Sequence, residues 1–171
     1  MNKTKQLVLT AMFIAIGVIL PQAFHAIPNA GSIFLPMHIP VLISGFVVGP
    51  LYGAICGALT VTLSHFIFSM PPAPVFPGMF FELTVYGLAA GLFYKLIKIE
   101  NGLVKNYVVL ILAMLSGRVC YGILNALIFK AGSYSFAAWI SAALTTALPG
   151  IIIQLILIPI LVDRLKKVNL F

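Results

Sequence analysis

Apolar stretches long enough to cross a membrane recur along almost the whole chain, and this feature limits the possible folds more than any other. Apolar residues make up 62% of the 171 residues, whereas charged residues make up only 8%. The mean hydropathy of +1.16 is outside the range of domains that present a charged surface to water. Because backbone polar groups in lipid must be satisfied within the chain, apolar spans of this kind fold as helices. We therefore predict an all-α integral membrane protein with a single transmembrane domain over residues 1–171.

Proline, glycine, asparagine and charged residues divide the apolar sequence into six predicted transmembrane helices. They run approximately over residues 6–23, 37–49, 51–69, 79–97, 106–129 and 137–163. The second is short for a span, which needs about 20 apolar residues, so we expect it to depend on its neighbours. We predict that the first is a span and not a signal peptide, because no small-residue cleavage site follows it.

Basic residues are distributed unevenly between the two ends of such a bundle. One end carries Lys3, Lys5, Lys95, Lys98, Lys105, Arg164, Lys166 and Lys167, and the other carries Lys130. Because loops rich in Lys and Arg stay in the cytoplasm, we predict that both termini are cytoplasmic (N-in and C-in). Residues 24–40, 69–78 and 130–135 would then form outer loops. The formal charge of +7 thus indicates orientation rather than a nucleic-acid partner.

Small residues four positions apart predict close contacts between helices. The pairs are Gly45 and Gly49, Gly53 and Gly57, Gly87 and Gly91, and Ala11 and Ala15. Small side chains allow helix backbones to approach each other in lipid. We interpret the three glycine pairs as internal packing.

Two charged side chains lie within the predicted spans, Glu82 in FFELTVYG and Arg118 in SGRVCYG. Charges at this depth are costly and indicate a functional site unless they form a structural pair. Helical spacing places Tyr86 on the face of Glu82, and it places Tyr121 and Asn125 on the face of Arg118. Two interpretations remain open: the charges pair with each other, or each contacts one end of a ligand.

The connection FHAIPNAGSIFLPMHIP, residues 24–40, contains no charged residue but has two histidines and three prolines. We predict that it forms a lid over an apolar pocket. The residues predicted to contact a substrate are Phe24, His25, Phe34, His38, Met79, Glu82, Tyr86, Arg118, Tyr121 and Asn125. A metal site is not expected, because the histidine spacings match no compact ligand motif.

Enzyme motifs are missing from the sequence. It contains no G-x-S-x-G, H-E-x-x-H or G-x-x-x-x-G-K-[ST] motif and no pair of carboxylates on one predicted helix. We therefore predict no enzymatic activity, no cofactor and no ATP hydrolysis by this chain. Cys56 and Cys120 fall within apolar stretches and are interpreted as packing residues.

Several segments resemble the S components of energy-coupling factor (ECF) transporters: AMFIA, GSIFLPMHIPVLISGFVVGPLYGAICG, MPPAPVFPGMFFELTVYGLAAGL and GRVCYGILNAL. These small subunits of bacterial cell membranes capture vitamins, and the resemblance, over the whole chain, is to the group that includes pyridoxine, hydroxymethylpyrimidine and pantothenate carriers. It implies a substrate-binding subunit of an ATP-driven importer, whose partners are a transmembrane coupling subunit and two ATPase subunits. Ala11 and Ala15 match the family's docking motif for the coupling subunit.

The substrate is left open between two chemical classes. A carboxylate-bearing vitamin such as pantothenate would suit an unpaired Arg118. A heteroaromatic vitamin or precursor would suit Glu82, Asn125 and His38, and is favoured if Glu82 and Arg118 pair. A solitary secondary transporter and a structural membrane protein are the alternative functions.

Overall fold

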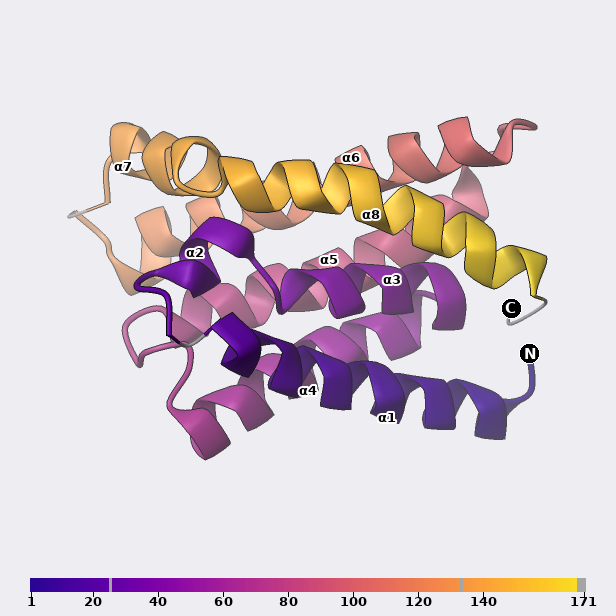
Figure 1. Ribbon diagram of the computed structural model, residues 1–171. Coiled ribbons are helices and arrows are strands. Elements are labelled where there is room, and N and C mark those ends of the chain that lie inside the picture. Colours follow the sequence, from indigo (N-terminus) through magenta and orange to yellow (C-terminus); the bar gives the residue numbers. More distant parts are fainter. Residues whose placement is uncertain (25, 133, 169–171) are drawn as a thin grey trace.

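The computed structural model describes residues 1–24, 26–132 and 134–168, and within these ranges it contains helices and no strands (Figure 1). The elements are α1 (Lys3–Ile19), η1 (Leu20–Phe24), α2 (Ala30–Phe34), α3 (His38–Val48), α4 (Pro50–Phe68), α5 (Phe76–Leu96), α6 (Gly102–Leu124), η2 (Asn125–Phe129), α7 (Phe136–Ile140), η3 (Ser141–Thr145) and α8 (Leu148–Lys167). Six helical stretches of the described residues are long and apolar enough to cross a membrane. The predicted all-α fold with six spans is confirmed.

The two ends of the bundle differ in what they contain. The start of α1 and the end of α8 lie together at one end, and η1, α2 and α7 lie at the other (Figure 1). We call the latter the α2 end; it also holds residues 69–75, between α4 and α5. The predicted loops at 24–40 and 69–78 therefore meet at one end of the molecule.

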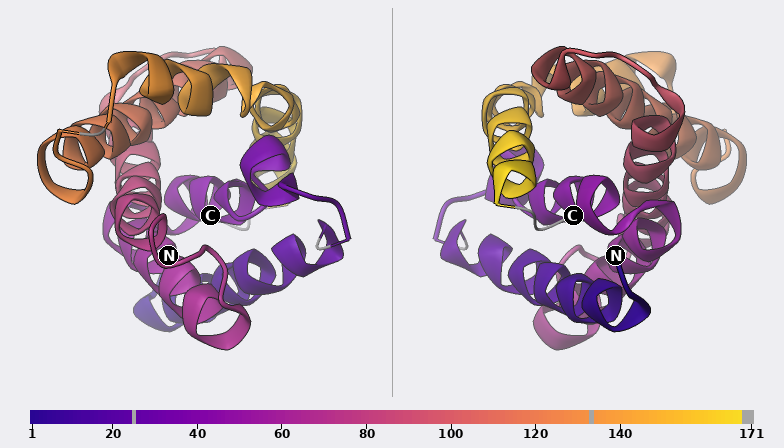
Figure 2. Two further views of the ribbon diagram at one scale, coloured as in Figure 1. Left: turned by 90° about the vertical axis from the view of Figure 1, so that its left-hand side faces the viewer. Right: turned by 90° about the vertical axis from the view of Figure 1, so that its right-hand side faces the viewer.

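Helix α3 is short, as predicted, and occupies the interior of the bundle. All eleven of its residues except Ile39 are buried. It packs against α1, α4, α5 and α8, and the end-on views show the longer helices arranged around it (Figure 2). An apolar helix that is buried on all sides depends on its neighbours for its position. The preceding α2 completes the span Ala30–Val48, so part of the predicted lid is helical.

The sixth predicted helix, 137–163, is wrong as a single element. The structure divides this region into α7, η3 and α8. Proline lacks the N–H that a helix interior requires and fits best in the first turn, and Pro149 occupies that position in α8. Gly150 lies against α2, where an added Cβ would be 2.8 Å from the carbonyl oxygens of Ile33 and Phe34. The helix therefore begins anew at Leu148, in close contact with α2.

Glycines form the contacts between α3, α4 and α5. A Cβ added to Gly45 or to Gly53 would lie 2.5 Å from the carbonyl oxygen of Gly87. Added carbons on Gly57 and Gly91 would likewise overlap backbone atoms of the facing helix. The packing interpretation is confirmed for these glycines. Gly49 differs, because its φ of 90° makes it the turn residue that joins α3 to α4.

Gly87→Ala is expected to lower the thermal unfolding midpoint of the purified protein, because the new methyl group would overlap the Gly53 carbonyl. Overpacking of a tight contact costs about 1–3 kcal/mol. Gly102→Ala is the matched control, since a Cβ there meets no atom within 4 Å. Equal unfolding midpoints for the two variants would contradict this description of the α4–α5 contact.

Candidate functional site

A cavity of about 570 Å³ lies at the α2 end of the bundle. Small-molecule sites typically enclose about 300–1,000 Å³. The lining residues are Pro21, Phe24, Ile27, Pro28, Asn29, Ala30, Gly31, Ser32, Leu35, Pro36, Met37, His38, Met70, Pro71, Pro72, Val75, Met79, Glu82, Arg118, Tyr121, Ala142 and Thr146. The cavity is thus large enough for a vitamin-sized ligand.

Two connecting segments form walls of the cavity. The first wall is residues 27–38, which include α2, and the second is residues 70–75 between α4 and α5. His65 on α4 supports the second wall, because its Nδ1 lies 2.6 Å from the Pro71 carbonyl oxygen. Its ring also stacks on Phe76, with the ring centroids 4.4 Å apart. The described residues of the third predicted loop, 130–135, do not line the cavity, whereas Ala142 and Thr146 do.

An ion pair between α5 and α6 lies beside the cavity. Arg118 Nη1 is 2.9 Å from Glu82 Oε1, and the Tyr86 hydroxyl donates a hydrogen bond of 3.0 Å to the same oxygen. Glu82 is 2% exposed and Tyr86 is 1% exposed. Of the two interpretations of these charges, the structure favours pairing, although Glu82 and Arg118 both also line the cavity.

Several nitrogen atoms of side chains beside the cavity have no hydrogen-bond partner among the described residues. These are Arg118 Nε and Nη2 and both ring nitrogens of His38. His38 Nε2 lies 4.0 Å from Glu82 Oε2, which is too long for a hydrogen bond. Buried polar groups normally have partners. Those that line a cavity are therefore suited to bind polar atoms of a ligand.

A family model for the substrate-specific component of ECF transporters matches residues 5–162. The chain belongs to this family. No curated protein and no solved structure matches it significantly. A substrate-specific component is a transporter subunit and not an enzyme. The described residues of this one include six apolar helical stretches, as in a multi-pass membrane protein.

This substrate-specific component brings six of the predicted contact residues to the cavity: Phe24, His38, Met79, Glu82, Arg118 and Tyr121. Three others lie outside its lining. Tyr86 is behind Glu82, and Phe34 packs on Phe24 with ring centroids 5.6 Å apart. Asn125 is 2% exposed and donates a hydrogen bond of 2.8 Å to the Tyr121 carbonyl oxygen. The remaining predicted residue, His25, lies outside the described residues.

Three polar lining residues of the substrate-specific component were not singled out from the sequence: Asn29, Ser32 and Thr146. Asn29 and Ser32 belong to the predicted lid, where a search for polar side chains would have found them. Thr146 carried no signal, because it falls inside the stretch predicted as one continuous helix. The described residues contain no group of three His, Cys, Asp or Glu side chains that could hold a metal ion.

Proposed function

We propose that this chain captures a small water-soluble vitamin or vitamin precursor in the cavity at the α2 end, as the substrate-binding subunit of an ATP-driven ECF importer. One observation carries the proposal: a cavity of about 570 Å³ with unpartnered donors of His38 and Arg118 beside a buried ion pair. A mostly apolar cavity with a few converging polar groups is the usual form of a small-molecule site.

The ion pair favours a heteroaromatic substrate of the pyridoxine or hydroxymethylpyrimidine type over pantothenate. Glu82 already compensates the charge of Arg118 at 2.9 Å. A substrate carboxylate would add a second negative charge close to Glu82, which is unfavourable at a buried position. A neutral ring could accept hydrogen bonds from Arg118 Nε or Nη2 and from His38, with Phe24 and Tyr121 as aromatic contacts.

The proposed partners are the transmembrane coupling subunit and two ATPase subunits. Ala11 and Ala15 are both exposed on α1, so neither side chain is used in packing within the chain. A stripe of small, exposed residues suits close contact with a helix of another subunit. The proposed orientation has both termini in the cytoplasm of a bacterial cell and the α2 end outside, in agreement with the basic residues near the termini.

Titration calorimetry on the purified chain tests the substrate class. Pyridoxine or hydroxymethylpyrimidine is expected to bind at least about ten-fold more tightly than pantothenate, a difference of about 1.4 kcal/mol. His38→Ala should weaken binding of the ring compound, because one hydrogen bond is worth about 0.5–1.5 kcal/mol. Tighter binding of pantothenate would assign the site to a carboxylate, and binding of none of the three would contradict the proposed substrates.

A further inference from the structure

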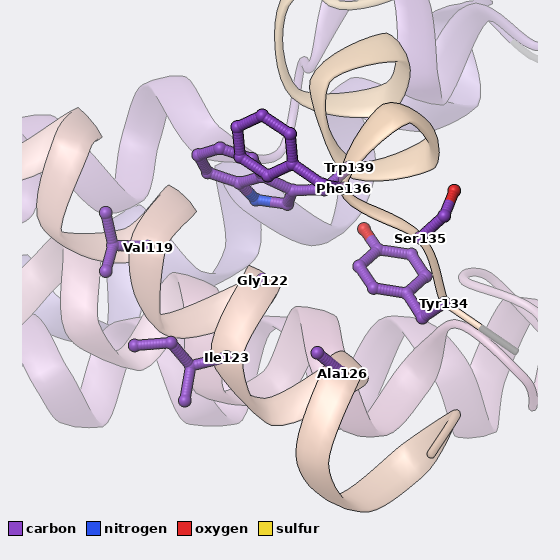
Figure 3. Close-up of a pocket in the computed structure, with 8 residues that line it drawn as sticks. All are labelled: Val119, Gly122, Ile123, Ala126, Tyr134, Ser135, Phe136 and Trp139. Atoms are coloured by element: carbon purple, nitrogen blue, oxygen red, sulfur yellow. The ribbon is translucent and has the colours of Figure 1, made fainter. Parts of the chain in front are cut away.

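A second, smaller groove lies beside the α2 end of α6, apart from the residues of the substrate cavity. Its volume is about 290 Å³. Figure 3 shows its lining residues: Val119, Gly122, Ile123, Ala126, Tyr134, Ser135, Phe136 and Trp139. The first four come from α6 and η2, and the others come from the start of α7 and the two residues before it. None of them lines the substrate cavity.

The groove faces the surroundings of the bundle and not its core. Val119 is 46% exposed, Ile123 is 52% exposed and Phe136 is 72% exposed. Helix α6 belongs to one of the six stretches that are suited to cross a membrane. An apolar groove on the outer surface of such a helix is in contact with lipid, so an acyl chain is the group that fits it.

The floor and one wall of the groove are built for close contact. Trp139 lies over Gly122, where an added Cβ would be 2.5 Å from the indole Nε1 (Figure 3). The same Nε1 donates a hydrogen bond of 3.1 Å to the Arg118 carbonyl oxygen. Phe136 extends this wall, with its ring centroid 5.6 Å from that of Trp139. A hydrogen bond thus holds the indole in position, and the lack of a side chain at Gly122 leaves room for it.

A lysine lies beside one end of the groove, against the ring of Tyr134. Tyr134 lines the groove, and Lys130 Nζ lies 5.6 Å from the centroid of its ring. The Tyr134 hydroxyl is itself buried and has no hydrogen-bond partner among the described residues, and its burial raises the pKa of this group. Trp and Tyr side chains concentrate at the level of lipid headgroups, and a lysine there attracts anionic lipids. An apolar groove with a lysine beside it matches the acyl chain and the charged headgroup of one anionic phospholipid.

We propose that this groove binds an anionic phospholipid from the leaflet at the α2 end. One acyl chain lies between Ile123 and Phe136, and the phosphate lies near Lys130. The site is separate from the substrate cavity and does not depend on which vitamin the chain binds. Its contact with the substrate site is through the hydrogen bond between Trp139 and the Arg118 backbone.

The position of Trp139 allows a direct test, because it is the only tryptophan in the sequence. The chain is reconstituted into bilayers with equal amounts of phosphatidylcholine and phosphatidylglycerol. Bromine, a short-range quencher of indole fluorescence, is placed on the acyl chains of one lipid or of the other. We expect more quenching of Trp139 by the brominated anionic lipid, with an enrichment of about five-fold, the ratio that corresponds to about 1 kcal/mol for one lysine.

Lys130→Gln should abolish this preference, so that the two brominated lipids quench Trp139 equally. Lys98→Gln is the matched control, since it removes an exposed lysine at the other end of the bundle. Equal quenching by both lipids in the unmodified chain would overturn the proposal, as would a preference that survives in Lys130→Gln. If neither lipid quenches Trp139, the groove is covered by protein, such as a second copy of the chain, and the proposal is wrong.

Discussion

Replacing Arg118 by methionine is expected to cause the largest loss of stability of any single substitution considered, and to abolish substrate binding. The change leaves Glu82, which is 2% exposed, without its partner at 2.9 Å. Breaking a buried ion pair by removing one member costs about 3–5 kcal/mol, because the other charge remains buried. The thermal unfolding midpoint and the calorimetric titration of the same preparation measure the two effects.

The double variant Glu82→Gln/Arg118→Met separates folding from binding. It removes both charges together, and the new amide oxygen can still accept the hydrogen bond that the Tyr86 hydroxyl now donates to Glu82. Neutral replacement of a buried pair is often harmless to stability, so we expect recovery of the unfolding midpoint. Binding should remain absent, because Arg118 Nε and Nη2 are lost as donors. Full binding by the double variant would show that the pair has only a structural role.

Ala15→Trp is expected to abolish uptake without changing substrate affinity. Ala15 is exposed on α1 and does not line the cavity. A bulky side chain on a small-residue face keeps two helices apart, so the coupling subunit should no longer dock. Uptake is measured in proteoliposomes that contain the coupling subunit and both ATPase subunits with ATP inside, and affinity is measured by calorimetry on the isolated chain.

Leu115→Trp on α6 is the matched control, because Leu115 is 56% exposed on another helix and its replacement also adds an indole to the surface. Unchanged uptake by Ala15→Trp would place the docking face elsewhere. Reduced affinity would instead assign Ala15 a role in the fold. Sustained uptake by the unmodified chain alone, driven by a proton gradient, would indicate a solitary secondary transporter.

Most of the fold could be predicted from hydropathy, because spans in lipid must be apolar and helical. The break at residues 146 and 147, between η3 and α8, could not be predicted from hydropathy. The apolar sequence continues through it, and hydropathy alone does not show where one helix ends and the next begins. Pro149 was the available signal, since a proline favours the first turn of a helix over its interior.

The two charges of the site were found from the sequence, but their pairing was not. Pairing depends on how α5 and α6 are aligned along their length, and helical periodicity within one segment contains no such information. In the structure, the ring of Tyr86 packs directly against the backbone of Gly117. Any Cβ at position 117 would overlap that ring. This contact places Arg118 opposite Glu82. A glycine next to a buried arginine is a signal that could have suggested the alignment.

Mass spectrometry of small molecules released from the purified chain tests the capture of a vitamin most directly. The chain is purified in mild detergent from cells grown in rich medium and is then denatured, beside the double variant Glu82→Gln/Arg118→Met. We expect a ring compound of the pyridoxine or hydroxymethylpyrimidine type in stoichiometric amount from the unmodified chain and its absence from the variant. Release of the same molecule in equal amount from both proteins would contradict a substrate site beside Glu82 and Arg118.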